Sequence, residues 1–149
     1  MSLTEIEREY LSTQRLGRLA TVGPKGDPQN NPVGFAYNEE TGTIDIYGRN
    51  LANTRKFRNV RRNDQVSLVI DDLVSTDPWA VRGIEIRGRA EALTEQAVPG
   101  SYLSPEIIRI HPRIVFSWGI DPSAEGMTKR VVTMTTAQPQ HDDALDEAL

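Results

Sequence analysis

The residues with the clearest chemical potential are the cations of one short segment. Between residues 49 and 62 no acid occurs, and this cationic segment holds Arg49, Arg55, Lys56, Arg58, Arg61 and Arg62. Thr54 or Asn53 is a suitable N-cap for a helix here, so Arg55 and Lys56 would fall in its first turn. Cations oppose the helix dipole at that end. A bound phosphate would reverse this cost, because free backbone N–H groups and both cations could hold it together.

Two other interpretations of the cationic segment stay open. A run of like charges can simply form a solvated basic face. A basic helix could also bind nucleic acid. Aromatic residues are not interleaved with these cations, and the rest of the chain has no basic excess, so both features argue against nucleic acid. We therefore expect a small-molecule partner and no nucleic acid.

The side chains that most enzymes use for catalysis are scarce. The chain has no cysteine, and its two histidines, His111 and His141, have no second metal-binding side chain at ligand spacing. The sequence has no glycine-rich dinucleotide motif, no P-loop and no nucleophile elbow. We expect no metal site and assign no catalytic residue. A bound cofactor would have to supply the chemistry.

The elements expected around the cationic segment are mainly short strands. A capping box at residues 4–7 predicts a helix that ends near Gly17, and a second helix is expected over 53–62 with Phe57 and Val60 buried. Alternation and turn residues predict strands at 18–22, 29–37, 43–47, 65–70, 84–93, 106–110 and 114–118, with 131–134 as a candidate for one more. Six or seven short strands with few helices favour a compact β-barrel.

Four local features carry more specific expectations. Strict alternation at 43–47 predicts a strand with one wet face, and the stretch 71–80 has no period and is expected to be a loop. Gly88 is a possible bulge. His111 and Pro112 are expected to join the last two strands of the barrel.

The net charge divides the chain into two parts. The formal charge is −4 over 149 residues, but residues 137–149 hold four acids and no lysine or arginine, which leaves 17 acids against 17 lysines and arginines elsewhere. We expect one domain over 1–136 and an acidic tail over 137–149. The first residues are acidic, without a signal-peptide pattern, and no apolar run is long enough to cross a membrane. The sequence therefore predicts a cytoplasmic protein without a membrane partner.

The order of several short motifs resembles a known family. These motifs are RLATV at 18–22, GDP at 26–28, PVGF at 32–35, TRK at 54–56, RNV at 58–60 and VSLV at 66–69. Together they are similar to the pyridoxamine 5′-phosphate oxidase-like split β-barrel proteins. DPW at 77–79, RGIEIRG at 82–88, IHPR at 110–113 and SWG at 117–119 most resemble the actinobacterial branch that uses the deazaflavin coenzyme F-420. The resemblance covers roughly residues 4–120.

The resemblance implies a fold, a partner and a cofactor site. The fold would be mainly β, a split β-barrel like that of FMN-binding proteins, in a homodimer with two cofactor sites at the interface. The residues implied at the cofactor phosphate are Thr54, Arg55 and Lys56. Those implied along the ring are Asn31, Pro32, Val33, Ile46, Tyr47 and Gly48. Contacts from the other subunit could come from Trp79, Arg82 and Trp118. Several of these side chains also suit a barrel core or a dimer contact.

The implied activity is hydride transfer between the reduced deazaflavin and a small unsaturated acceptor. FMN is an alternative cofactor, because it presents a ring, a ribityl chain and a phosphate to the same site. The deazaflavin also has a lactyl and oligoglutamyl tail, for which Arg49, Arg58, Arg61 and Arg62 are available. A non-catalytic flavin or deazaflavin carrier is a further alternative. Pyridoxal phosphate synthesis is not expected, because the C-terminal Arg- and His-containing segment of the vitamin oxidases is absent.

Overall fold

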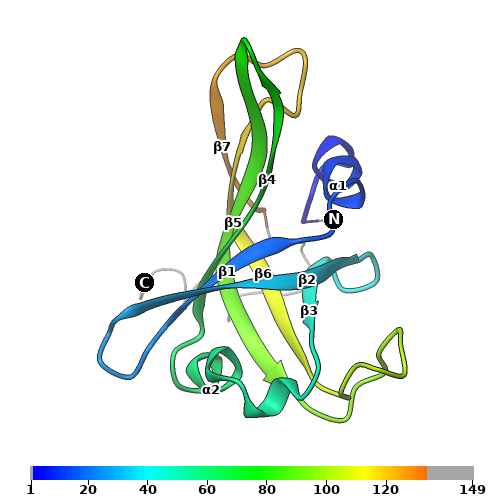
Figure 1. The fold of residues 1–149 in the computed structure, drawn as a ribbon, viewed down its shortest axis with the longest axis vertical. Helices are drawn as coiled ribbons and strands as arrows, with labels where there is room; N and C mark the ends of the chain where they lie inside the picture. The colour runs from blue at the N-terminus through cyan, green and yellow to red at the C-terminus, as the bar shows by residue number, and fades with distance from the viewer. Residues whose placement is uncertain (1, 134–149) are drawn as a thin grey trace.

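The chain folds into a closed antiparallel β-barrel with two short helices (Figure 1). The computed structural model describes residues 2–133. In chain order the elements are α1 (Glu5–Ser12), β1 (Gly17–Val22), β2 (Pro28–Asn38), β3 (Thr43–Tyr47), the 3-10 turn η1 (Leu51–Asn53), α2 (Arg55–Arg62), β4 (Gln65–Thr76), β5 (Trp79–Leu93), β6 (Ile107–Trp118) and β7 (Met127–Val131). The strand order is β3-β2-β1-β4-β5-β6-β7, and a β3–β6 pairing closes the barrel. The predicted mainly β fold is confirmed.

The barrel is split where β6 changes its neighbour. Residues 108–110 of β6 pair with β3, whereas residues 114–118 pair with β7. The N-terminal segment bridges this opening. Glu7 of α1 forms an ion pair with Arg130 of β7, and the Ser2 hydroxyl hydrogen-bonds to the Gly42 carbonyl in the turn before β3. The capping box at Thr4 and Glu7 is present as predicted, but α1 ends at Ser12, well before Gly17.

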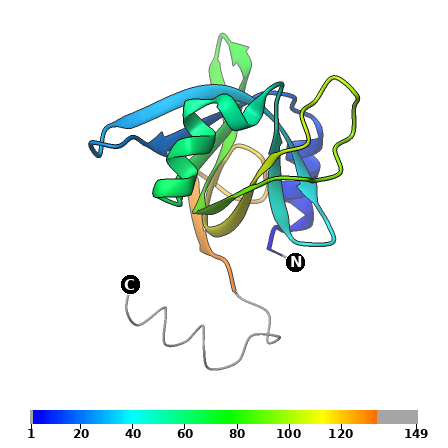
Figure 2. The ribbon, with the colours of Figure 1, turned by 90° about the horizontal axis from the view of Figure 1, so that it is seen from below.

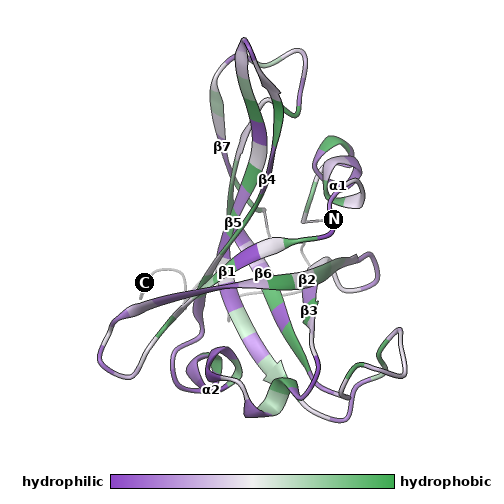
Figure 3. Ribbon diagram, viewed as in Figure 1, coloured by the Kyte–Doolittle hydropathy of each residue, from purple (hydrophilic) through white to green (hydrophobic). Residues whose placement is uncertain are grey.

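The core is built from the inward side chains of every barrel strand and from one face of each helix. Hydrophobic and hydrophilic residues alternate along these strands (Figure 3). Phe57 of α2 is fully buried and Val60 nearly so, as the helical period predicts. Ile44, Ile46 and Leu68 are also fully buried. The apolar side of α2 therefore packs on the barrel and leaves its cations outside.

The stretch 71–80, predicted as a loop, is part of a long hairpin. β4 continues to Thr76, and β5 begins at Trp79 after a cis Asp77–Pro78 bond. The hairpin extends beyond the barrel as an arm (Figure 1). Neither face of the arm is uniformly buried, and Leu73 and Val74 are exposed. The prediction was wrong because a strand outside the core has no burial pattern to reveal its period.

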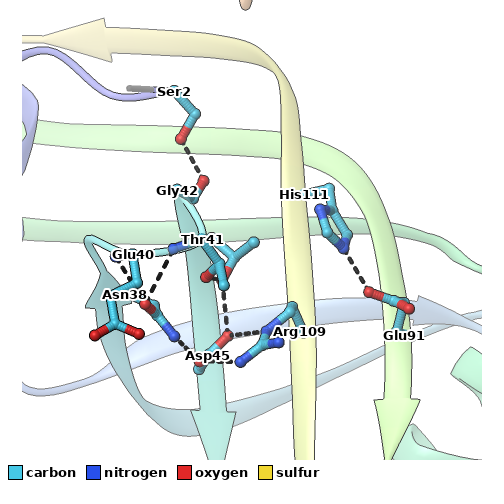
Figure 4. Close-up of polar contacts among 10 residues, drawn as sticks. Ser2, Asn38, Glu40, Thr41, Gly42, Asp45, Glu91, Arg109 and His111 are labelled. Atoms are coloured by element: carbon cyan, nitrogen blue, oxygen red, sulfur yellow. Dashed lines mark hydrogen bonds and ion pairs between the residues drawn. The ribbon is translucent and has the colours of Figure 1, made fainter. Parts of the chain in front are cut away.

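The prediction that β3 has one wet face was also wrong. Thr43 and Asp45 on its polar face are buried. Asp45 accepts hydrogen bonds from Arg109 Nε at 3.1 Å and Nη2 at 3.2 Å, and others from Asn38 and Thr43 (Figure 4). This network of polar partners across the β3–β6 closure satisfies a carboxylate that alternation alone assigns to solvent.

The two closing strands expected at 106–110 and 114–118 form a single strand, β6. Ile107–Trp118 is continuous through His111 and Pro112, and the pairing with β5 shifts register between Arg87 and Gly88. The bulge suggested at Gly88 is therefore confirmed. A Cβ atom at Gly88 would lie 2.0 Å from the His111 carbonyl oxygen, so only glycine fits there.

The expectations for the C-terminal part of the chain can be compared with the structure only as far as residue 133. A seventh strand exists, but it spans Met127–Val131 rather than 131–134. The acidic tail over 137–149 lies outside the described residues, and the domain boundary at residue 136 stays a prediction. Within residues 2–133, no helix is long and apolar enough to cross a bilayer.

Candidate functional site

A cleft of about 560 Å³ lies between β2 and the start of α2. Its lining residues are Asp27, Gln29, Asn30, Asn31, Thr54, Arg55 and Lys56. The β1–β2 hairpin runs beside α2 in both views of the ribbon (Figures 1 and 2). The structure thus brings the predicted phosphate residues Thr54, Arg55 and Lys56 together with Asn31, one of the predicted ring residues.

The start of α2 has the geometry of a helix cap with donors left over. Thr54 is extended (φ −91°, ψ 156°), and its hydroxyl donates to the Leu51 carbonyl at 2.7 Å while accepting weakly from the Phe57 N–H at 3.4 Å. The first N–H groups of any helix have no intrahelical acceptor. The N–H groups of Arg55 and Lys56, two residues that line the cleft, are therefore free to bind a phosphate.

The cations of this segment form no ion pair with an acid in the described part of the chain. Eight ion pairs occur among residues 2–133, and none of them uses a side chain from 49–62. Burial without a carboxylate lowers the pKa of Lys56. Each cation of the first turn adds an uncompensated positive charge at the positive end of α2. An anion is the partner that this arrangement lacks, and the residues present fit a phosphate.

A second cleft of about 430 Å³ adjoins the first and shares Asp27, Gln29 and Arg55 with it. Lys25, Arg58 and Arg62 add three more cations to its lining. Arg58 also donates to the Asn53 carbonyl at 2.9 Å, and Arg62 to Asn59 Oδ1 at 2.9 Å, so both are held near the helix. The two clefts together form a continuous cationic surface along α2, a mostly hydrophilic helix (Figure 3).

The two remaining cations of the segment, Arg49 and Arg61, lie over aromatic rings outside the clefts. The Arg61 guanidinium lies 4.8 Å from the centroid of the Phe57 ring, and that of Arg49 lies 5.7 Å from the Tyr102 ring. Neither Arg61 nor Arg49 lines the two clefts. Of the four arginines considered for a cofactor tail, only Arg58 and Arg62 are therefore placed beside the phosphate residues.

The predicted ring residues take different positions. Pro32 is exposed next to Asn31 on β2, whereas Val33 and Ile46 are buried in the core and could meet a ring only through their backbone. Tyr47 is half-buried opposite Gly34, and its pKa is raised by burial and by nearby Asp45.

The strip of β2 beside these residues is open. A Cβ atom added at Gly34 would meet nothing within 4 Å. Gly48 lies at the end of β3, and its carbonyl accepts hydrogen bonds from the Ser104 N–H and hydroxyl. A planar group could therefore lie along the small exposed residues of β2 with Tyr47 at its side.

Three predicted residues lie on the arm or on the strand next to it, away from the cleft. Trp79 is 71% exposed near the tip of the hairpin, and Trp118 packs over Gly83 at the end of β6. Arg82 forms a bidentate pair with Asp72, with Nε at 2.8 Å and Nη2 at 3.2 Å. Figure 1 shows the arm and α2 at opposite ends of the molecule. Within one chain these residues cannot reach the phosphate site.

The sequence analysis missed four residues of the site. Asp27, Gln29 and Asn30 line the cleft, and Asn59 is buried beside it with its amide on Gln29. Asn59 is two residues from Phe57 on α2 and so does not share its face, and the helical period could not reveal it. The other three follow only from the packing of the hairpin against α2, which no local pattern encodes.

Another hollow of similar size lies on a different side of the barrel. It measures about 570 Å³ and lies over the outer faces of β1, β4, β5 and β6, with Arg87, Arg89 and Arg113 among its lining. It contains none of the predicted site residues, and we do not assign the cofactor to it. Among residues 2–133 no group of three or more metal-binding side chains occurs.

Comparison with known proteins identifies relatives of the whole barrel. Residues 3–136 match the family described as pyridoxamine 5′-phosphate oxidase. A curated relative from Streptomyces rimosus subsp. rimosus is 48% identical over 122 residues, which cover 81% of this chain and 86% of that protein. It is named a 5a,11a-dehydrotetracycline/5a,11a-dehydrooxytetracycline reductase.

Two solved structures share the fold at lower identity. A conserved hypothetical protein of Mycobacterium tuberculosis is 23% identical with a TM-score of 0.62, covering 83% of this chain and 93% of that one. A structure titled F420 reductase is 22% identical with a TM-score of 0.58, covering 76% of this chain and 98% of its own. These likenesses support the split-barrel architecture.

Proposed function

The chain belongs to the pyridoxamine 5′-phosphate oxidase family, and within it we propose a reductase that takes hydride from a reduced deazaflavin coenzyme. The relative that is 48% identical over most of the chain is a reductase, and this chain is an oxidoreductase. The observation that carries the cofactor assignment is the cleft beside α2, whose cations take part in none of the ion pairs of the described residues.

The proposed phosphate site is formed by Thr54, Arg55 and Lys56. The Arg55 and Lys56 side chains and the free N–H groups of the first helical turn would bind the phosphate with charge-assisted hydrogen bonds. Thr54, whose hydroxyl donates to the Leu51 carbonyl, would cap the helix start beside it. Asn31 and Pro32 would place the ring along β2, beside Tyr47. The bound deazaflavin supplies a hydride donor, so the protein needs to hold and shield the ring rather than provide an acid or a base.

The adjoining cleft favours the deazaflavin over FMN. FMN ends at its phosphate, whereas the deazaflavin continues into a lactyl and oligoglutamyl tail whose carboxylates need cations. Lys25, Arg58 and Arg62 line a cleft that begins where the phosphate residues end. A tail that continues from the bound phosphate would therefore enter a cleft lined by these three cations.

The proposed acceptor is an activated double bond in a polycyclic compound. This follows from the name of the Streptomyces reductase, whose substrates are dehydrotetracyclines. The ring would lie along the open strip of β2 next to Gly34, where an added Cβ meets no atom within 4 Å, and the acceptor would bind on the outward face of the ring.

We further propose that the protein is a homodimer. The arm exposes large apolar residues, with Val74 at 60% and Trp79 at 71%, and Met127 and Val131 of β7 are 66% and 67% exposed. Apolar side chains gathered on a protruding hairpin commonly mark an interface. A second copy could also bring Trp79, Arg82 and Trp118 to a cofactor site that they cannot reach in their own chain. Light scattering would test this, because a monomer at micromolar concentration would contradict it. The cytoplasmic location remains a prediction.

The activity is tested with the reduced deazaflavin coenzyme and a dehydrotetracycline as acceptor. We expect the visible absorption of the oxidised coenzyme to appear only when enzyme and acceptor are both present, with a product that has gained two hydrogen atoms. Reduced FMN in a parallel assay tests the alternative cofactor. Tight coenzyme binding without oxidation by any acceptor would instead indicate a carrier and contradict the proposed activity.

A further inference from the structure

A single carboxylate stands among the cations of both clefts. Asp27 lines the phosphate cleft and the adjoining cleft, and it is the one acid in the lining of either. It shares both linings with Arg55. An acid at an anion site is unfavourable for anion binding in general, so its position needs a specific explanation.

Hydrogen bonds hold this carboxylate in place. Gln29 Nε2 donates to Asp27 Oδ2 at 3.1 Å, and the Lys25 N–H donates to Oδ1 at 3.3 Å. Gln29 is itself fixed, because its Oε1 accepts from the buried Asn59 amide at 2.8 Å. The hydrogen bond from Gln29 is the first cause of the lowered pKa of Asp27, and the charge of Arg55 adds to it. The carboxylate is therefore ionised at neutral pH and is held by hydrogen bonds at the turn that borders both clefts.

The two candidate cofactors differ in the charge of their phosphate. FMN ends in a phosphomonoester, which carries about two negative charges above pH 7. The deazaflavin has a phosphodiester, with one negative charge, because the lactyl group occupies another oxygen. A fixed negative charge repels the monoester about twice as strongly as the diester at the same position.

We propose that Asp27 makes the phosphate cleft select phosphodiesters over terminal phosphates. This inference rests on the proposed function, since it concerns the same cleft and the same cofactor phosphate. The cations supply attraction for any phosphate, and Asp27 supplies repulsion that grows with phosphate charge. Specificity built from one repulsive element among attractive ones is a general strategy in binding sites.

A purely structural role for Asp27 makes a different prediction. The side chain caps the β1–β2 turn by accepting from the Lys25 N–H, and asparagine could accept the same hydrogen bond. Asp27→Asn therefore removes the charge and preserves the turn. If the residue only supports the turn, this substitution leaves phosphate selectivity unchanged.

The test uses FMN and its phosphate methyl ester, which differ in phosphate charge and by one methyl group, and compares the ratio of their Kd values between variants so that the effect of the methyl group cancels. Fluorescence titration at pH 8 gives the Kd of each for the wild type, Asp27→Asn and a control, Glu40→Gln, which removes an exposed acid in the β2–β3 turn. Asp27→Ser, which keeps a hydroxyl acceptor for the Lys25 N–H, serves as a second variant. The deazaflavin coenzyme is titrated in parallel.

We expect Asp27→Asn to strengthen FMN binding about 10-fold and ester binding about 3-fold, so that their Kd ratio changes about 3-fold. Glu40→Gln should leave the ratio unchanged. An unchanged ratio in both Asp27 variants would overturn the inference and leave the proposed function intact. Failure of the wild type to bind the deazaflavin coenzyme would contradict the proposed function itself.

Discussion

The side-chain amide of Asn59 on α2 donates to Gln29 Oε1 on β2 at 2.8 Å, and to the Thr21 hydroxyl on β1 at 3.0 Å. Asn59 is 3% exposed. These two bonds fasten the helix that carries the phosphate residues to the hairpin that forms the opposite wall of the cleft. The width of the cleft therefore depends on a residue that does not line the phosphate cleft itself.

Replacing Asn59 should damage both stability and binding. Asn59→Leu removes both donors and leaves the Thr21 and Gln29 acceptors unpaired, which we expect to lower the free energy of unfolding by about 2 kcal/mol. Cofactor affinity should fall as well, because the hairpin is no longer fixed to α2. Urea denaturation and fluorescence titration measure the two effects, with the exposed Gln65→Ala as control. Unaltered affinity in a folded Asn59→Leu protein would show that the hydrogen bonds do not shape the cleft.

Lys56 gives the binding reaction a characteristic pH dependence. Its pKa is lowered by burial in the free protein, and a bound phosphate favours the charged form. Affinity should therefore be full at neutral pH and decline as the pH rises, beginning below the range of an ordinary lysine. Titrations between about pH 7 and 10 would record this decline. Lys56→Arg, which stays charged throughout, should flatten the profile; identical profiles for both proteins would contradict a role for Lys56 at the phosphate.

The ion pair between Asp45 and Arg109 should be a major support of the closed barrel. The Asp45 side chain is 3% exposed and that of Arg109 is 20% exposed. Arg109→Ala leaves a buried carboxylate without its cation, and we expect a loss of about 3 kcal/mol in unfolding free energy. The exposed Arg89–Asp64 pair, at 3.5 Å, is the control, and Arg89→Ala should cost less than about 1 kcal/mol. Equal losses for the two variants, by urea denaturation, would refute this ranking.

The bulge between β5 and β6 depends on Gly88. A methyl group at this position would lie 2.0 Å from the His111 carbonyl oxygen, so Gly88→Ala must displace backbone. We expect a loss of about 3 kcal/mol or more in unfolding free energy. Gly34→Ala is the matched control, because its added methyl meets no atom within 4 Å. Thermal unfolding compares the two, and a Gly88→Ala protein as stable as Gly34→Ala would disprove the steric argument.

The sequence predicted what local patterns encode. Thr54 caps a helix whose period buries Phe57, and the turn residues before Pro28 form the expected hairpin. The arrangement of the site was less accessible. Gln29 and Asn59 are 30 residues apart, and their contact arises only when the barrel closes.

The errors share a physical cause. Asp45 is buried because Arg109, 64 residues away, neutralises it, and alternation cannot reveal such a partner. Val74 lies in a strand outside the core, where no period is imposed. Patterns of burial therefore predicted the barrel strands well. They predicted poorly the buried polar network between β3 and β6 and the arm outside the barrel.

The central claim is that Arg55 and Lys56 hold the phosphate of a deazaflavin. The most direct test is a titration of the oxidised coenzyme into the wild type and into the double variant Arg55→Ala, Lys56→Ala, followed by coenzyme fluorescence. The matched control is the double variant Arg49→Ala, Arg61→Ala, which removes two cations of the same segment that lie outside both clefts. We predict a loss of about 100-fold in affinity for the first double variant and little change for the second. Equal affinity in all three folded proteins would contradict the claim.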